Sequence, residues 1–184
     1  SFSALTLAVD SSQEKSQASG FRSTFGTEFW VHWDRNNSTT GFSPRLFIAA
    51  ASDADVTVTY PNGSSESLTV SAGSVGDVNA DEILAAPVAV NQGTDNIRDV
   101  GVQVVSDVPV SVYLLNLQNA TSDASIAYPS EFLGTRYRIV TADPVSNAAD
   151  RFSVLAVEAG TTSVQITPTS SFGARTAGTT FTVS

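Results

Sequence analysis

Cysteine and methionine are both absent from these 184 residues, and lysine occurs only at Lys15, beside eight arginines. Without cysteine the fold holds no disulfide, and thiol chemistry is excluded. The missing initiator methionine predicts either a processed terminus or a piece of a longer chain. No apolar run approaches the roughly 20 residues of a membrane-spanning helix, so we expect no membrane insertion.

Positive charge is scarce, and the formal net charge is −9. Nucleic-acid binding needs clustered lysine and arginine, so this balance excludes nucleic acid as a partner. Anionic membrane surfaces are poor partners for the same reason. Hydrophobic residues make up 41% of the chain and charged residues 15%. These proportions predict an ordered globular protein with a substantial core.

A β-rich segment recurs along the chain at a spacing of 54 residues. The central copy, Gly101–Asn116 (GVQVVSDVPVSVYLLN), has β-branched strands on both sides of a hinge at Ser106–Pro109. Equal shifts align it with Ile48–Thr59 and with Ala156–Thr167. We predict three hairpins in an all-β fold, an antiparallel β-sandwich built from repeated hairpins. A radial repeat of blades is the second choice.

Shorter elements are predicted between the hairpins. The Asn-Gly pair of Pro61–Gly63 predicts a tight turn before a returning strand at Glu66–Val70. We expect a short helical connector at Ser130–Leu133, a strand at Tyr137–Ala142 and a last strand at Thr179–Val183.

The N-terminal segment Ser1–Asp10 has strand character, and the polar stretch Ser11–Gly20 behind it is typical of a linker. We therefore divide the chain into residues 1–20, a tethered strand, and residues 21–184, the β-sandwich domain. The strand has two uses: it folds back as an edge strand, or it pairs with a neighbouring copy. In the second case the subunit contacts are Phe2, Leu5, Leu7 and Val9.

An aromatic cluster stands at Trp30, His32 and Trp33. Strand alternation puts Trp33 with Phe29 and Val31 on one face and Trp30 with His32 on the other. The cluster is a candidate platform for a sugar ring; the alternative is aromatic packing in the core. His32 is the only histidine and has no companion readable as a catalytic or metal-binding partner.

Two acidic groups have spacings that a calcium loop uses, although neither has the glycine and final glutamate of a dedicated loop. They are Asp53 with Asp55, and Asp95 with Asn96 and Asp99. Backbone capping in turns is the alternative for both, and we expect no other cofactor. Four glycosylation sequons begin at Asn36, Asn37, Asn62 and Asn119. They weakly favour an exported protein.

Four stretches carry a resemblance to a known family: Gly101–Asn116, Ser122–Ala124, Tyr128–Tyr137 (YPSEFLGTRY) and Phe152–Thr167. Through them residues 101–183 resemble the N-terminal domain of the IgG Fc-binding protein family, and Gly26–Val31 and Leu46–Val70 are similar to the family's opening. The resemblance implies a secreted all-β binding or adhesion module without enzymatic activity. The family domain is longer after the position of Val183, so we expect a truncated chain or a neighbour that completes the sheet.

No catalytic signature is present: glycine-rich phosphate loops and a Gly-x-Ser-x-Gly elbow are both absent. We therefore predict an extracellular or cell-surface protein that is not an enzyme. The preferred function is a subunit of a surface filament or array that self-associates by strand addition through Ser1–Asp10. The alternative is a monomeric module of a larger adhesin, binding a glycan or glycoprotein.

Overall fold

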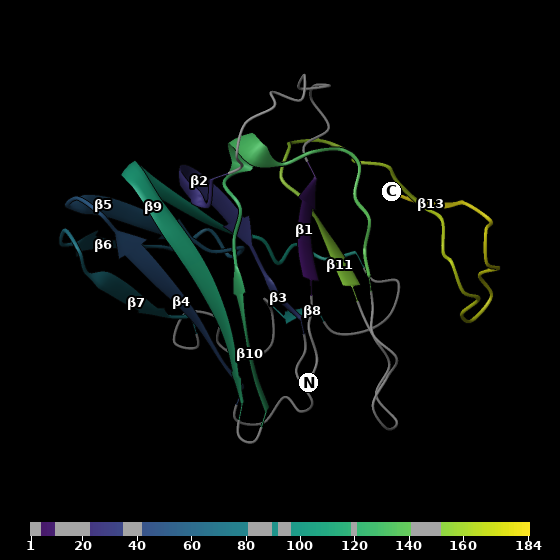
Figure 1. Ribbon diagram of the computed structural model, residues 1–184, viewed down its shortest axis with the longest axis horizontal. Helices are drawn as coiled ribbons and strands as arrows, with labels where there is room; N and C mark the ends of the chain where they lie inside the picture. Colours follow the sequence, from purple (N-terminus) through teal and green to yellow (C-terminus); the bar gives the residue numbers. More distant parts are fainter. Residues whose placement is uncertain are drawn as a thin grey trace.

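The computed structural model describes residues 5–9, 23–34, 42–80, 90–91, 97–118, 121–140 and 152–184 (Figure 1). Its strands are β1 (Leu5–Val9), β2 (Phe25–Val31), β3 (Trp33–Asp34), β4 (Phe42–Ala50), β5 (Ala54–Thr59), β6 (Ser65–Val70), β7 (Val75–Asn79), β8 (Val90–Asn91), β9 (Val102–Gln118), β10 (Thr121–Ile126), β11 (Phe152–Ala156), β12 (Val164–Ile166) and β13 (Phe181–Val183). One 3-10 turn, η1, covers Ser130–Phe132. The all-β prediction is confirmed. Among the described residues, no helix has the length and apolar character that crossing a bilayer requires.

The main sheet has seven strands and is organised around β9, a strand of 17 residues that runs through its middle (Figure 1). Along one edge of β9, β5 pairs with the first half and β4 with the second half. Along the other edge, β2 pairs with the first half and β10 with the second. The outer strands β6 and β7 then extend the sheet beyond β5 and β4.

A single hydrophobic core lies on one face of this sheet. Along β9, alternate residues from Val102 to Leu114 point inward, and Val104, Val110 and Val112 are fully buried. Phe29 of β2 packs into the same cluster. Both halves of the sheet contribute to one core, so β9 joins them into one body. A sandwich of two separate sheets stays a prediction.

The predicted central hairpin is wrong, because Gly101–Asn116 lies mostly within the unbroken strand β9. At the expected hinge residues, β9 changes its partner strand, and the chain does not reverse its direction. Ser106 pairs with β5, and Val110 is the next residue to pair with β4. On the opposite edge, β2 shifts register between Gly26 and Glu28. Pro109 therefore sits where β9 has no ladder partner on either edge, and its missing N–H breaks no ladder bond.

The two flanking hairpins are also wrong in their pairing, although their strands exist. Consecutive strands β4 and β5 pair with successive halves of β9 and not with each other. Similarly, β11 pairs with β1, whereas β12 pairs with β13. At the β4–β5 corner the Asp53 carboxylate accepts a hydrogen bond from the Ala72 N–H at 2.8 Å. The Asp107 carboxylate accepts one from the Asp55 N–H, also at 2.8 Å. These aspartates cap backbone at the sheet corner, and a cap does not require the chain to reverse.

The turn at Pro61–Gly63 is confirmed: β5 and β6 form a hairpin, and Gly63 has a φ of 82°. Only glycine adopts this conformation without strain. The short helical connector is confirmed as η1, and the last strand as β13. The predicted strand at Tyr137–Ala142 is wrong over residues 137–140, which have no regular structure; residues 141–142 lie outside the described ranges.

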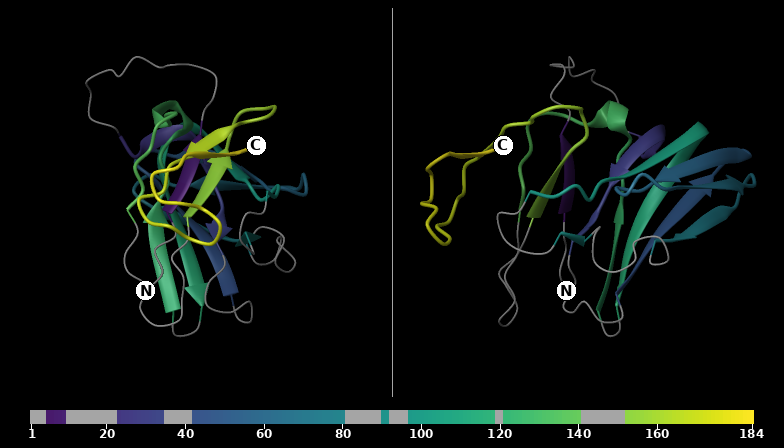
Figure 2. Two further views of the ribbon diagram at one scale, coloured as in Figure 1. Left: turned by 90° about the vertical axis from the view of Figure 1, so that its right-hand side faces the viewer. Right: turned by 180° about the vertical axis from the view of Figure 1, so that it is seen from behind.

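Within the described residues, three small sheets accompany the main sheet. Strand β1 pairs in parallel with β11, β3 pairs in parallel with β8, and β12 pairs antiparallel with β13. The β1–β11 pair stands beside the main sheet, and the β12–β13 hairpin projects away from it at the end of the chain (Figure 2). Within that hairpin Arg175 lies over the ring of Phe181, with its guanidinium carbon 4.1 Å from the ring centre.

Tyr60, at the end of β5, gives the protein a predicted sensitivity to alkali. It is buried, and its hydroxyl donates to a Glu66 carboxylate oxygen at 3.5 Å. Burial, then the Glu66 charge, then this hydrogen bond raise the pKa of Tyr60 above its ordinary value of about 10. The folded state thus holds the proton that the unfolded state releases above about pH 10. Stability from this site is complete below that pH and is lost as pH rises further.

We expect the urea midpoint to fall more steeply in alkali for wild type than for Tyr60→Phe. Equal falls would contradict the assignment.

Candidate binding surface

The outer face of the sheet is apolar where β4, the second half of β9 and β10 lie side by side. Its five apolar side chains, called here the β4–β9–β10 face, are Phe47, Tyr113, Leu115, Leu117 and Ile126, and the register places Ser43, Arg45 and Ser122 beside them. The register pairs Phe47 with Tyr113, and Tyr113 with Ile126. Tyr113 is 41% exposed and Leu117 37%. A contiguous apolar patch with an aromatic centre is typical of a surface that another molecule covers.

The same face is mostly polar around the first half of β9. There the Thr69 hydroxyl donates to the Asp55 carboxylate at 2.8 Å, and the Gln103 amide donates to Glu28 at 2.7 Å. The apolar exceptions are Val105, which is exposed, and Trp30, which is partly exposed opposite Gln103. Polar groups that already bond one another give a surface that needs no partner. The two halves of one outer face therefore differ in chemistry, and only the second half has the character of a binding surface.

An ion pair borders the apolar face on the side of β7. Arg45 of β4 donates from Nε to Asp77 Oδ1 at 3.0 Å, and its second nitrogen contacts Asp77 Oδ2. Both side chains are partly exposed. A two-pronged arginine–carboxylate contact holds both groups in place, so this border is fixed before any partner arrives.

This surface was not among the predicted sites, although the sequence of β9 carries a signal for it. From Val110 to Leu117, β9 has apolar residues on both faces, because Val112 and Leu114 point inward while Tyr113 and Leu117 point outward. A half-buried strand in which apolar and polar residues alternate strictly would have polar residues at the outward positions. The break in alternation predicts a strand half that is covered on both faces.

The aromatic cluster proposed as a sugar platform does not form a shared exposed surface. Trp33 is 2% exposed and His32 3%, whereas only Trp30 is partly exposed. The Trp33 indole N–H donates to the Leu115 carbonyl at 3.2 Å from inside the fold. Trp30 turns its indole N–H to Glu28 at 3.3 Å on the outer face. Stacking a sugar needs open ring faces, which Trp33 and His32 do not offer.

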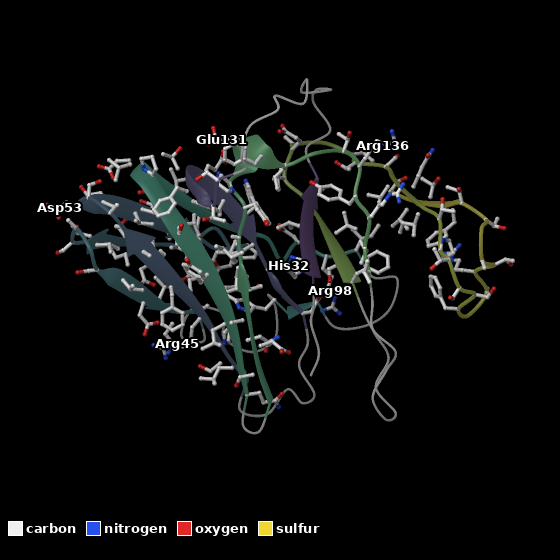
Figure 3. All side chains as sticks on the ribbon, viewed as in Figure 1. His32, Arg45, Asp53, Arg98, Glu131 and Arg136 are labelled. Atoms are coloured by element: carbon white, nitrogen blue, oxygen red, sulfur yellow. The ribbon has the colours of Figure 1, made fainter. Side chains whose placement is uncertain are left out.

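His32 belongs instead to a buried polar cluster between the main sheet and the β1–β11 pair (Figure 3). Its Nε2 lies 3.7 Å from Asp34 Oδ1, and the Ser153 hydroxyl of β11 donates to that same oxygen. The Asp34 carbonyl accepts from the Asn116 amide at 3.0 Å. Asp34 thus ties β11 to β9 from the end of β3. In a nucleophilic triad the histidine stands between serine and aspartate, whereas here the aspartate is central.

The calcium candidates are placed only in part. Asp53 lies at the end of the sheet farthest from the β1–β11 pair, and its carboxylate caps Ala72 (Figure 3). Asp95 and Asn96 lie outside the described residues, and Asp99 is just before β9. Within the described ranges, no group of three histidine, cysteine, aspartate or glutamate side chains comes together to hold a metal ion.

The donor-strand residues are placed in their own chain. Leu5, Leu7 and Val9 lie in β1, opposite Phe152, Val154 and Ala156 of β11, and Phe2 lies outside the described residues. This is the fold-back alternative for the N-terminal strand. Of the sequons, Asn62 is exposed in the β5–β6 turn, where its Oδ1 accepts from the Ser64 N–H at 2.9 Å. Asn36, Asn37 and Asn119 lie outside the described residues, and glycosylation stays a prediction.

The C-terminal third of the chain is the part that matches a known family. Residues 123–184 match the family described as IgGFc binding protein. The resemblance inferred from Tyr128–Tyr137 and Phe152–Thr167 is thereby confirmed for this part of the chain. The IgGFc-binding match takes in most of β10 together with η1, β11, β12 and β13. One strand of the β4–β9–β10 face therefore lies within the matched span.

Other comparisons add little. No curated protein matches the chain. The crystal structure of Thermotoga maritima 1070 is similar at a TM-score of 0.36 with 13% identity, over 57% of this chain and 95% of that one. A similarity this low has no bearing on function.

Proposed function

We propose that this protein is an extracellular, non-enzymatic binding module that takes a glycoprotein partner on the β4–β9–β10 face. The observation that carries the proposal is the exposed apolar face centred on Tyr113, next to the self-bonded polar half of the same sheet. Tyrosine and arginine are enriched among residues that dominate binding energy, and Tyr113 and Arg45 both lie here. The family match at residues 123–184 supports a role in binding.

The absence of a catalytic role is part of the proposal and has its own support. Ser153 and His32 both approach the same oxygen of Asp34, so the histidine is not placed to take a proton from the serine. All three side chains are also buried at the junction with β11. This arrangement favours a structural tie over a reaction centre.

Filament assembly by strand donation has weaker support. It would need β1 to leave β11 of its own chain and pair with another copy, whereas β1 already pairs along its whole length with β11. A net charge of −9 on every subunit also opposes self-association. A binding module is therefore preferred.

The IgG Fc fragment is the first partner to test, because the matched family is described as IgGFc binding protein. We expect saturable binding by surface plasmon resonance, and Tyr113→Ser should weaken it at least about tenfold through loss of the aromatic centre. Val105→Ser is the matched control, since Val105 is 43% exposed on the polar half of the same strand. It should leave affinity unchanged. Absence of Fc binding, or equal losses in the two variants, would overturn the proposal.

A further inference from the structure

The outer edge of β10 is open. Strand β10 pairs with β9 on one side, and no described strand pairs with its other side. The side chains of Ser122, Ala124 and Ser125 are exposed. A strand edge of this kind presents a row of backbone N–H and C=O groups with which another strand can pair.

The register identifies which backbone groups face outward. The Ala127 N–H donates to the Val112 carbonyl at 2.9 Å, which makes these two residues a hydrogen-bonded pair with β9. In an antiparallel ladder such pairs alternate, so Asp123 and Ser125 also turn their backbone groups toward β9. The backbone groups of Ser122, Ala124 and Ile126 then point away from β9. Another extended backbone is the ligand that matches this alternation.

Strand β10 has one of the usual protections of an exposed edge, the charged residue Asp123, and lacks the others. Natural proteins block such edges with lysine, proline, a bulge or a very short strand. The strand has six residues, TSDASI, without lysine or proline, and its register with β9 is unbroken. The small side chains of Ser122 and Ala124 leave the backbone accessible. At the opposite border of the face, the Arg45–Asp77 ion pair links β4 to the middle of β7.

The open edge continues the β4–β9–β10 face. Ile126 lies opposite Tyr113 and Ala124 lies opposite Leu115, so the outward residues of β10 share one side of the sheet with the apolar residues of β9. A strand added to β10 would place alternate side chains beside Ile126 and within reach of Tyr113. The edge supplies hydrogen bonds and the face supplies apolar contact.

We propose that the β10 edge binds an extended segment of the partner as an additional strand, with alternating apolar side chains and a net positive charge. The identity of the partner rests on the proposed function, whereas the geometry of the β10 edge is independent of it. The charge of −9 disfavours a second copy of this chain as the occupant and favours a basic segment.

The test uses the full chain and hydrogen exchange measured residue by residue by NMR. The probe is a short synthetic peptide of alternating threonine and valine with lysine at both ends. Its control is the same peptide with alternate backbone nitrogens methylated, which cannot donate to the edge. We expect the amides of Ser122, Ala124 and Ile126 to exchange fast in the free chain and to become protected by the unmethylated peptide only. The proposal would be overturned if these three amides were already protected in the free chain. It would also be overturned if neither saturating peptide nor Fc protected them.

The variant Ala124→Pro removes one outward N–H and leaves the ladder with β9 intact, since proline is tolerated on edge strands. It should weaken peptide binding about tenfold. Ala124→Ser keeps the amide and should bind as wild type does. Peptide binding without Fc binding would defeat the proposed function and leave the edge proposal standing. The opposite result would be Fc binding that Tyr113→Ser weakens, that Ala124→Pro leaves unchanged and that does not protect the three amides. It would defeat the edge proposal and leave the proposed function standing.

Discussion

Replacing Phe29 by alanine should destabilise the fold by about 3–5 kcal/mol, as large aromatic deletions in a packed core do. Phe29 is 0% exposed and is one of the largest fully buried side chains in the described core. It reaches that core from β2, where it lies opposite Val104 of β9. The truncation removes apolar contacts from both strands and leaves a cavity that a close-packed β-sheet cannot collapse around. The expected loss is a large part of the total stability of a domain this size.

Phe25 provides a matched control for this measurement. It is the same residue type in the same strand, but 44% exposed, so Phe25→Ala should change stability by about 0.5 kcal/mol or less. Both variants should be compared by urea unfolding, with attention to whether the slope of the transition stays constant. Similar losses for the two variants would show that β2 is not anchored through Phe29.

Replacing Gly26 by alanine should cost about 2–3 kcal/mol, because the site has no room for a methyl group. A Cβ built at Gly26 would lie 2.4 Å from Cβ and 2.6 Å from Cγ of Pro129. The proline ring has few alternative positions, and Pro129 immediately precedes η1. The clash therefore pushes η1 from β2 at the point where β2 already shifts register against β9.

Gly134→Ala is the control for this second prediction. A Cβ at Gly134 would meet no atom within 4 Å, and its φ is not in the left-handed range. Its effect should be small, or slightly stabilising through the less flexible unfolded chain. A neutral result for Gly26→Ala would mean that the contact with Pro129 is looser than the structure has it.

Much of the local structure could be predicted from the sequence. Alternation correctly placed Phe29, Val31 and Trp33 on the inward side, since a half-buried strand needs apolar residues at every second position. The Asn-Gly turn at Asn62 was predictable because few residue pairs accept the required backbone conformation. The apolar β4–β9–β10 face was predictable in part, from the outward apolar residues Tyr113 and Leu117.

Strand pairing was not predictable from these patterns. Asp107 and Pro109 fit a hairpin turn, but they fit equally well a point where one long strand changes partners. An aspartate that caps a backbone N–H looks the same in both settings, and its donor here is Asp55, 52 positions away along the chain. Likewise, His32 gave no sign of a partner, because Ser153 arrives from a strand 119 positions further along.

The sequence by itself determined that the chain forms β-strands, where most of them lie and which side chains they turn inward. These properties depend on β-branching, alternation and turn chemistry, all of which act between neighbouring residues. The tertiary structure alone decided that β9 stays whole and that β1 closes on β11. It also decided that no described strand pairs with the outer edge of β10. In each case several strands far apart in the sequence could pair with the same backbone groups. The sequences of the connecting loops do not determine which of them pairs.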